Sequence, residues 1–85
     1  DETATRIGDN VMLEWYTLGE SAPLVGMSLE AADVRNETGA TVAAIERDDE
    51  VIQSPDPQRV FKPGDQLIVV GARENHEDFA AQFVG

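Results

Sequence analysis

The chain contains no cysteine, and its only lysine is Lys62. The absence of cysteine excludes a disulfide framework, a thiolate zinc site and a cysteine nucleophile. No apolar run approaches the roughly 20 residues that a membrane-spanning helix requires, and no signal-peptide pattern opens the sequence. The sequence therefore predicts a domain that does not insert into a membrane itself, with the cytoplasm as its default location.

The charge balance is strongly acidic, with 17 Asp and Glu residues against 6 Lys and Arg and a formal net charge of -11. Such a field repels phosphate backbones and argues against DNA or RNA binding. Two interpretations remain: an acidic, halophile-like surface that stays soluble in a high-salt cytoplasm, or an acidic docking face for a basic partner. Acids spread along the whole chain favour the first.

A length of 85 residues predicts one small domain whose core is marginal, so that a partner subunit would add stability. Residues 1–10 are polar and lack periodicity, which is typical of a linker or tail. We therefore expect the folded domain to occupy residues 11–85.

Residues 60–71, with the sequence VFKPGDQLIVVG, predict a turn that leads into a buried strand. Pro63 and Gly64 suit the two central positions of a type II turn, where Pro fixes φ and Gly allows φ > 0. The unbroken apolar run of residues 67–70 is typical of a central strand covered on both faces.

The other elements are arranged around this strand. We expect a strand at residues 11–18, a short helix capped by Ser28 and stopped by Gly39, a hairpin formed by residues 41–47 and 51–54, and a final helix after Gly71. The first helix is short enough to break near Asp33. The order predicts an α+β fold in which a small sheet with a β-hairpin packs against two short helices.

The aromatic residues of the first strand and the last helix indicate the core. Trp15 and Tyr16 are adjacent and must face opposite sides of a strand, so we expect one in the core and the other at an interface. Phe79 and Phe83 have helical spacing and should be buried, with Asn75 as the N-cap of their helix and His76 exposed among acids.

The ordered motifs resemble the C-terminal domain of RCK proteins, the TrkA-C domain, from about residue 11 to residue 83. The matching segments are GMSL (26–29), DVR (33–35), TG (38–39), VAAIER (42–47) and FKPGDQLIVVG (61–71). The resemblance implies a regulatory module of potassium channels or of Trk and Ktr uptake systems, which dimerises and in some members binds cyclic di-AMP across the dimer. The Gly-x-Gly-x-x-Gly loop of the family's nucleotide-binding domain does not occur in this chain, so no cofactor is expected.

The resemblance also implies a ligand site. It assigns to this site Leu29, Asp33, Val34, Arg35, Asn36, Thr41 and Pro57. Arg35 would hold a phosphate, because a guanidinium can bind one bidentately, although an ordinary surface ion pair with Asp33 or Glu37 is an alternative. Asn36 and Thr41 differ from the residues that are common at these family positions.

Three other charged groups can be interpreted either as structural features or as binding sites. Arg47 indicates a strand-end salt bridge beside Asp48 and Asp49 rather than an anion contact. The run of residues 48–50 predicts a hairpin turn, with a divalent-cation site as the alternative. A lone histidine at position 76 is weak evidence for a metal or pH-sensing site.

No nucleophile or acid–base pair is evident, so we expect no enzyme and assign no metal ligand. The sequence predicts a non-catalytic ligand-binding and dimerisation domain attached through a parent chain to a potassium or other cation transport system, with cyclic di-AMP as the candidate ligand. The alternatives are a purely structural dimerisation module and a divalent-cation sensor attached to another transporter.

Overall fold

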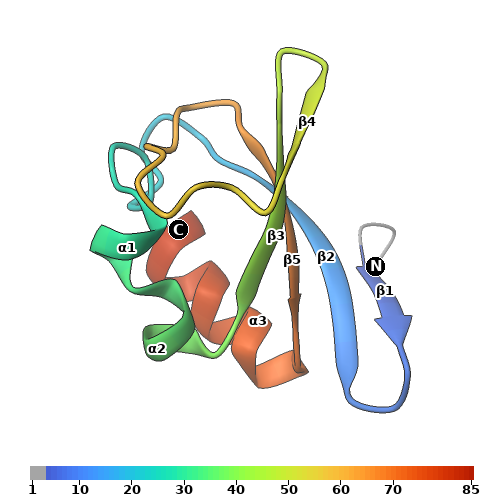
Figure 1. Ribbon diagram of the computed structural model, residues 1–85. Helices are drawn as coiled ribbons and strands as arrows, with labels where there is room; N and C mark the ends of the chain where they lie inside the picture. The colour runs from blue at the N-terminus through green and yellow to red at the C-terminus, as the bar shows by residue number, and fades with distance from the viewer. Residues whose placement is uncertain (1–3) are drawn as a thin grey trace.

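The computed structural model describes residues 4–85 and contains one sheet with helices packed on one side of it (Figure 1). The strands are β1 (Ala4–Ile7), β2 (Val11–Thr17), β3 (Thr41–Arg47), β4 (Glu50–Gln53) and β5 (Gln66–Gly71), and the helices are α1 (Leu29–Ala32), α2 (Val34–Thr38) and α3 (Arg73–Phe79), which continues into a π-helical turn, η1 (Ala80–Val84). The sheet order is β1-β2-β5-β3-β4, and every neighbouring pair is antiparallel. This architecture confirms the predicted α+β fold. No helix among the described residues is long and apolar enough to cross a membrane.

Strand β5 lies at the centre of the sheet, between β2 and β3. The turn before it is the predicted one: Gly64 has φ 88°, and the Asp65 N–H donates to the Lys62 carbonyl at 3.1 Å. The expectation that this strand is covered on both faces is wrong. Leu67 and Val69 are fully buried, whereas Ile68 and Val70 on the other face are half-buried, because all helices lie on one side of the sheet (Figure 1).

The two faces of the sheet therefore have different environments. The helix-covered face holds the core, in which Leu67 and Val69 join Phe79 and Phe83. The strand register places a second apolar set on the opposite side, which we call the open face. Its larger apolar members are Ile7, Val11, Leu13, Trp15, Ile68 and Val70. Tyr16 faces the core and Trp15 faces away from it, which confirms that these neighbours point to opposite sides.

Strand β1 was not predicted, because residues 1–10 were interpreted as a linker or tail. Residues 4–7 instead pair with β2 through a turn in which Gly8 has φ 76°. The segment Gly8-Asp9-Asn10 between Ile7 and Val11 is the turn signal that the polar composition obscured. Residues 1–3 lie outside the described part, and the assignment of residues 1–10 as a linker or tail stays a prediction.

The first helical segment follows the predicted caps. Ser28 Oγ accepts the Ala31 N–H at 3.1 Å, and Gly39 ends α2 with φ 77°. Asp33 separates α1 from α2 in a left-handed conformation with φ 54°, while its N–H still donates to the Leu29 carbonyl. The expected break near Asp33 is thus confirmed, and its cause is one residue of left-handed backbone.

The hairpin of β3 and β4 is also confirmed. Asp48 and Asp49 both have positive φ, 52° and 65°, as a two-residue turn of type I′ requires. Strand β3 contains a β-bulge between Val42 and Ala44, so that Ala43 is an extra residue relative to β5. Because of this bulge, Val42 and Ile45 both face the core although they are three residues apart.

The start of the last helix differs from the prediction. Ala72 rather than Asn75 is the N-cap, and the Asn75 side chain lies within the first turn, where its Oδ1 accepts the Ala72 N–H at 2.8 Å. This shift turns His76 inward, so the residue expected to be exposed is 3% exposed. Phe79 and Phe83 are buried as predicted.

Candidate functional site

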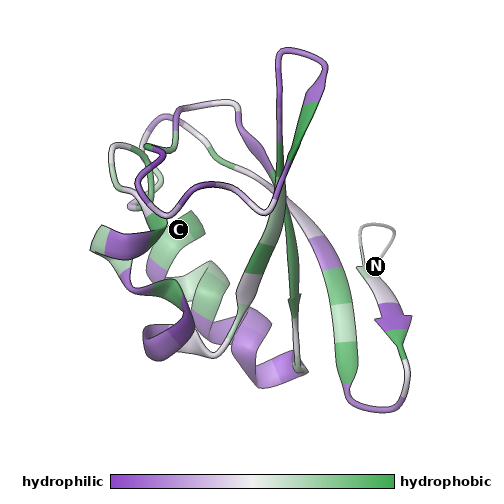
Figure 2. Cartoon of the chain, in the orientation of Figure 1, coloured by the Kyte–Doolittle hydropathy of each residue, from purple (hydrophilic) through white to green (hydrophobic). Residues whose placement is uncertain are grey.

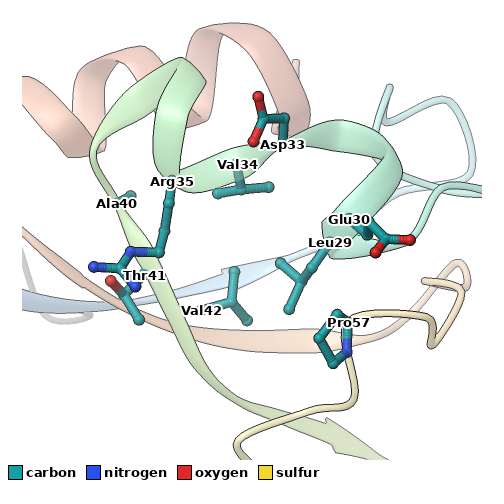
Figure 3. Close-up of a pocket in the computed structure, with 9 residues that line it drawn as sticks. All are labelled: Leu29, Glu30, Asp33, Val34, Arg35, Ala40, Thr41, Val42 and Pro57. Carbon is teal, nitrogen blue, oxygen red and sulfur yellow. The ribbon is translucent and has the colours of Figure 1, made fainter.

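A cavity of about 300 Å³ lies between the α1–α2 segment, the start of β3 and the chain that follows β4 (Figure 3). Its volume is at the lower end of the range that small-molecule pockets occupy. The lining residues come from three separate segments and are Leu29, Glu30, Asp33, Val34, Arg35, Ala40, Thr41, Val42 and Pro57.

The floor and one wall of the cavity are apolar. Leu29, Val34, Val42 and Pro57 point toward one another across it in Figure 3, from helix, strand and loop. Val34 is 2% exposed and belongs to the core, so this wall is fixed. Such a surface suits a flat, apolar group such as an aromatic base.

Two hydrogen bonds attach the Pro57 segment to α1. The Glu30 N–H donates to the Pro57 carbonyl at 3.0 Å, and Gln58 Nε2 donates to Glu30 Oε1 at 2.5 Å. The opposite corner, between α2 and β3, is held by Thr38, whose buried Oγ1 donates to the Val34 carbonyl and accepts the Ala40 N–H. These contacts hold both sides of the cavity in place, including the exposed loop that carries Pro57.

The rim carries charge of both signs, from Glu30, Asp33 and Arg35. Within residues 4–85, Arg35 forms no ion pair with Asp33, Glu37 or another carboxylate. The surface ion pair that was the alternative interpretation of Arg35 is therefore absent from the structure. In Figure 3 the guanidinium extends beside Thr41 at the mouth of the cavity, where it is available to an anion.

Most of the predicted site residues meet in this cavity. Leu29, Asp33, Val34, Arg35, Thr41 and Pro57 line it. Asn36 does not, because its side chain lies beside α2 and donates to Asp33 Oδ1 at 3.0 Å. Whether these residues bind a ligand stays a prediction.

Three lining residues were not predicted: Glu30, Ala40 and Val42. Glu30 lay within the predicted short helix without an assigned role, and Val42 was expected only as part of a strand. Their proximity to Pro57 depends on the return of the chain after β4. The sequence signal that remained unused is their immediate adjacency to the predicted residues Leu29 and Thr41.

Arg47 has a partner different from the one expected. Its guanidinium donates to both carboxylate oxygens of Asp65 at 2.7 Å and to the Val60 carbonyl at 3.1 Å, and Asp65 is 1% exposed. Burial by itself would raise the pKa of Asp65, but the hydrogen bonds from Arg47 and from the Lys62 N–H hold that pKa below its ordinary value. The pair is a buried bidentate contact that fixes the Pro63-Gly64 turn, and not a weak surface salt bridge.

His76 links α3 to β2. Its Nε2 lies 2.8 Å from the Met12 carbonyl, which can only accept, so in the neutral ring Nε2 carries the proton and Nδ1 accepts from the Tyr16 hydroxyl at 2.8 Å. Glu14 Oε2 lies 3.3 Å from Nδ1. Burial, followed by the charge of Glu14, raises the pKa of Tyr16 above its ordinary value. These contacts make His76 a packing residue with satisfied hydrogen bonds.

The acidic turn of residues 48–50 does not gather ligands for a cation. Among the described residues there is no group of three or more His, Cys, Asp or Glu side chains arranged to hold a metal ion. The turn interpretation of these residues is confirmed by the hairpin itself.

Comparison with known families identifies the family to which the chain belongs. Residues 13–84 match the TrkA-C domain. The chain belongs to the TrkA-C family, the C-terminal domain of RCK proteins, as the ordered sequence motifs indicated.

Two solved structures and one relative define its neighbours. The RCK_C domain dimer of Streptococcus agalactiae BusR in complex with c-di-AMP has a TM-score of 0.76 and 30% identity, over 84% of this chain and 93% of that one. The RCK C domain of the potassium transport protein KtrA in complex with c-di-AMP has a TM-score of 0.74 and 29% identity, over 81% of this chain and 79% of that one. A probable potassium channel protein of Methanocaldococcus jannaschii is 33% identical over 79% of this chain, which spans only 20% of that relative's length.

Proposed function

We propose that this chain is a non-catalytic, cytoplasmic regulatory domain that binds cyclic di-AMP in the cavity between α1, α2 and β3. The observation that carries the proposal is the convergence, in one cavity, of an apolar wall and an arginine that has no carboxylate partner among residues 4–85. The BusR and KtrA domains whose structures contain c-di-AMP have the same fold, which supports the assignment.

The chemistry of the ligand matches the cavity in two parts. An adenine would pack between Leu29, Val34 and Pro57, which are apolar and held by the core and by the Glu30–Pro57 hydrogen bond. A phosphate would lie at the mouth, where the Arg35 guanidinium can donate two parallel hydrogen bonds. Asp33 contributes through its left-handed backbone, which orients the first turn of α2 and hence Arg35.

A cavity of this volume accommodates half of a cyclic dinucleotide, so the proposed complex contains two chains around one ligand. The BusR complex with c-di-AMP contains a dimer of RCK_C domains, which supports this stoichiometry. The mechanism is linkage: a ligand that binds one dimer geometry more tightly shifts the population toward that geometry, by no more than its differential affinity. The parent chain would transmit the shift to a potassium or other cation transporter.

Glu30 and Asp33 oppose an anionic ligand at the rim, in a chain of net charge -11. We therefore expect the affinity for cyclic di-AMP to rise with salt concentration, because screening weakens this repulsion more than it weakens the short Arg35 contact. The same carboxylates favour the second candidate function, a dimerisation module that has lost its ligand.

Isothermal titration of cyclic di-AMP into the chain in molar KCl tests the proposal. We expect one ligand per two chains, loss of binding in Arg35→Ala, and unchanged binding in Arg59→Ala, a matched control whose exposed side chain lies outside the cavity. Absence of binding by the unaltered chain at both high and low salt would leave the dimerisation module as the function. Equal losses in the two variants would remove Arg35 from the site.

A further inference from the structure

The open face of the sheet carries an apolar surface that the core does not use. Leu13, Trp15, Ile68 and Val70 are half-buried, and none of them packs against the core cluster. Ile7 and Val11 extend the surface toward the sheet edge and are 48% and 38% exposed. Figure 1 shows the helices on the opposite side of the sheet, and Figure 2 shows hydrophobic positions along β2 and β5.

This face is also nearly free of charge. The chain has 17 acidic residues, yet the register of the strands places a single carboxylate, that of Glu46, on this side of the sheet. The remaining strand positions there are Thr, Gln, Ala and Val. In a chain that is acidic elsewhere, an apolar face with almost no carboxylates marks a surface selected for contact.

We infer that the open face is a self-association surface, on which the sheet of a second copy of this chain packs face to face. The distribution of charge favours a second copy of this chain over a basic partner. Two chains of net charge -11 repel each other wherever their acidic surfaces meet, and the centre of the open face is where two copies can approach without bringing carboxylates together. A basic partner would find carboxylates only at one end of this face, where Glu46 lies beside Asp48 and Asp49 of the β3–β4 turn.

The geometry fits an isologous contact between sheets. Sheets pack about 10 Å apart through interdigitating side chains, and a twofold axis places the same patch on both partners. Trp15 lies opposite Ile68 at the middle of the patch, and tryptophan is the residue type that most often anchors such contacts. The small core of an 85-residue chain adds a reason to bury this second apolar layer.

The central residues of this surface do not line the cavity that contains Arg35, although Thr41 borders both, so the inference does not depend on cyclic di-AMP. If both surfaces are used, two different twofold contacts per chain generate a tetramer or a larger assembly. Addition of ligand to a preformed sheet-to-sheet dimer would then increase its mass, whereas failure of ligand binding would leave that dimer unchanged.

Trp15 is the only tryptophan and reports directly on this face. We would measure its fluorescence emission and the molar mass by light scattering over a dilution series in molar KCl, without ligand. We expect a dimer at high concentration, with Trp15 emission at shorter wavelength than in the dilute monomer. Ile68→Glu should weaken association at least about tenfold, because it places an unpaired carboxylate in an apolar contact.

Two further variants keep the test decisive if Ile68→Glu fails to fold. Ile7→Glu and Val60→Glu change residues of nearly equal exposure, 48% and 47%, but only Ile7 lies on the open face. We expect weaker association for Ile7→Glu and no change for Val60→Glu. A monomer at every concentration, or an association that leaves Trp15 emission unchanged and tolerates the open-face variants, would overturn the inference and assign this face to another part of a longer protein.

Discussion

The two ends of strand β3 use arginine in opposite ways. At the end of the strand, Arg47 is committed to Asp65, which is almost completely buried and accepts two hydrogen bonds of 2.7 Å. At its start, Arg35 extends from α2 beside Thr41 without a carboxylate partner among the described residues. The difference indicates that an arginine supports the fold where its partner is buried, and is available for a ligand where the surroundings leave it unpaired.

The largest effect that tests this comparison is expected for Arg47→Ala. Removal of the guanidinium leaves the Asp65 carboxylate buried and uncompensated, which costs about 3–5 kcal/mol in the free energy of unfolding. Urea denaturation in molar KCl measures the change, with Arg59→Ala as a control that should stay within about 0.5 kcal/mol. Equal stability of the two variants would mean that the Arg47–Asp65 pair is no more than a surface contact.

The acid side of the stability profile gives a second test of the same pair. The pKa of Asp65 is held below its ordinary value of 3.8, so the ionised carboxylate contributes stability above that value and loses it as the pH falls through the lowered pKa. We expect the melting temperature of the unaltered chain to fall over this interval below pH 3.8. Asp65→Asn should have a lower melting temperature at neutral pH and a shallower fall in acid, and parallel curves for the two proteins would contradict this assignment.

A smaller difference in stability is expected between alanine substitutions at two glycines. One lies at the corner beside the cavity, and the other lies in the Pro63-Gly64 turn. Gly39 and Gly64 both have positive φ, but a Cβ at Gly39 would lie 2.6 Å from Asn75 Nδ2, whereas a Cβ at Gly64 would meet nothing within 4 Å. Gly64→Ala should cost about 1 kcal/mol for its left-handed backbone alone. Gly39→Ala should cost about 2 kcal/mol, because Asn75 must also move.

Thermal unfolding of the two glycine variants measures this difference. If Asn75 is the cause, Asn75→Ala should reduce the additional cost of Gly39→Ala and leave that of Gly64→Ala unchanged. Equal costs for the two glycine variants in the presence of Asn75 would show that the backbone conformation accounts for the whole effect.

The smallest expected change in stability is that of Arg35→Ala. The side chain is exposed and has no ion pair among the described residues, so its removal should change the free energy of unfolding by less than about 0.5 kcal/mol. Denaturation without ligand, run beside Arg47→Ala, completes the comparison of the two arginines. A loss of several kcal/mol would show that Arg35 has a structural role instead.

Features of local chemistry were predictable from the sequence. Ser28 caps α1, Gly39 ends α2, and Gly64 supplies the positive φ of its turn, because each depends on residues within one turn of the chain. The apolar wall of the cavity was also within reach, since the family resemblance assigned Leu29, Val34 and Pro57 to one site.

Features that depend on distant residues were not predictable. His76 is buried because its ring packs between α3 and β2. There it forms hydrogen bonds with the hydroxyl of Tyr16, 60 residues away, and with the Met12 carbonyl. Arg47 finds Asp65 because β3 and β5 are neighbours, although the nearer Asp48 and Asp49 were the obvious partners in sequence. Periodicity and propensity contain no information on such pairings.

The β-bulge at Ala43 has a consequence for chain length. It reverses the alternation of side chains within β3, so that Val42 faces the cavity and core while Arg47 still reaches Asp65 on the same side of the sheet. Deletion of Ala43 would restore strict alternation and leave Val42 and Arg47 on the same side of the sheet, because Ala43 is the residue that has no counterpart in β5. Insertion of one more residue between Val42 and Arg47 would instead turn one half of the strand over, which sacrifices either the ligand cavity or the buried ion pair. Their coexistence thus depends on the parity of a residue count, and this strand should tolerate the loss of its bulge residue better than the gain of another residue.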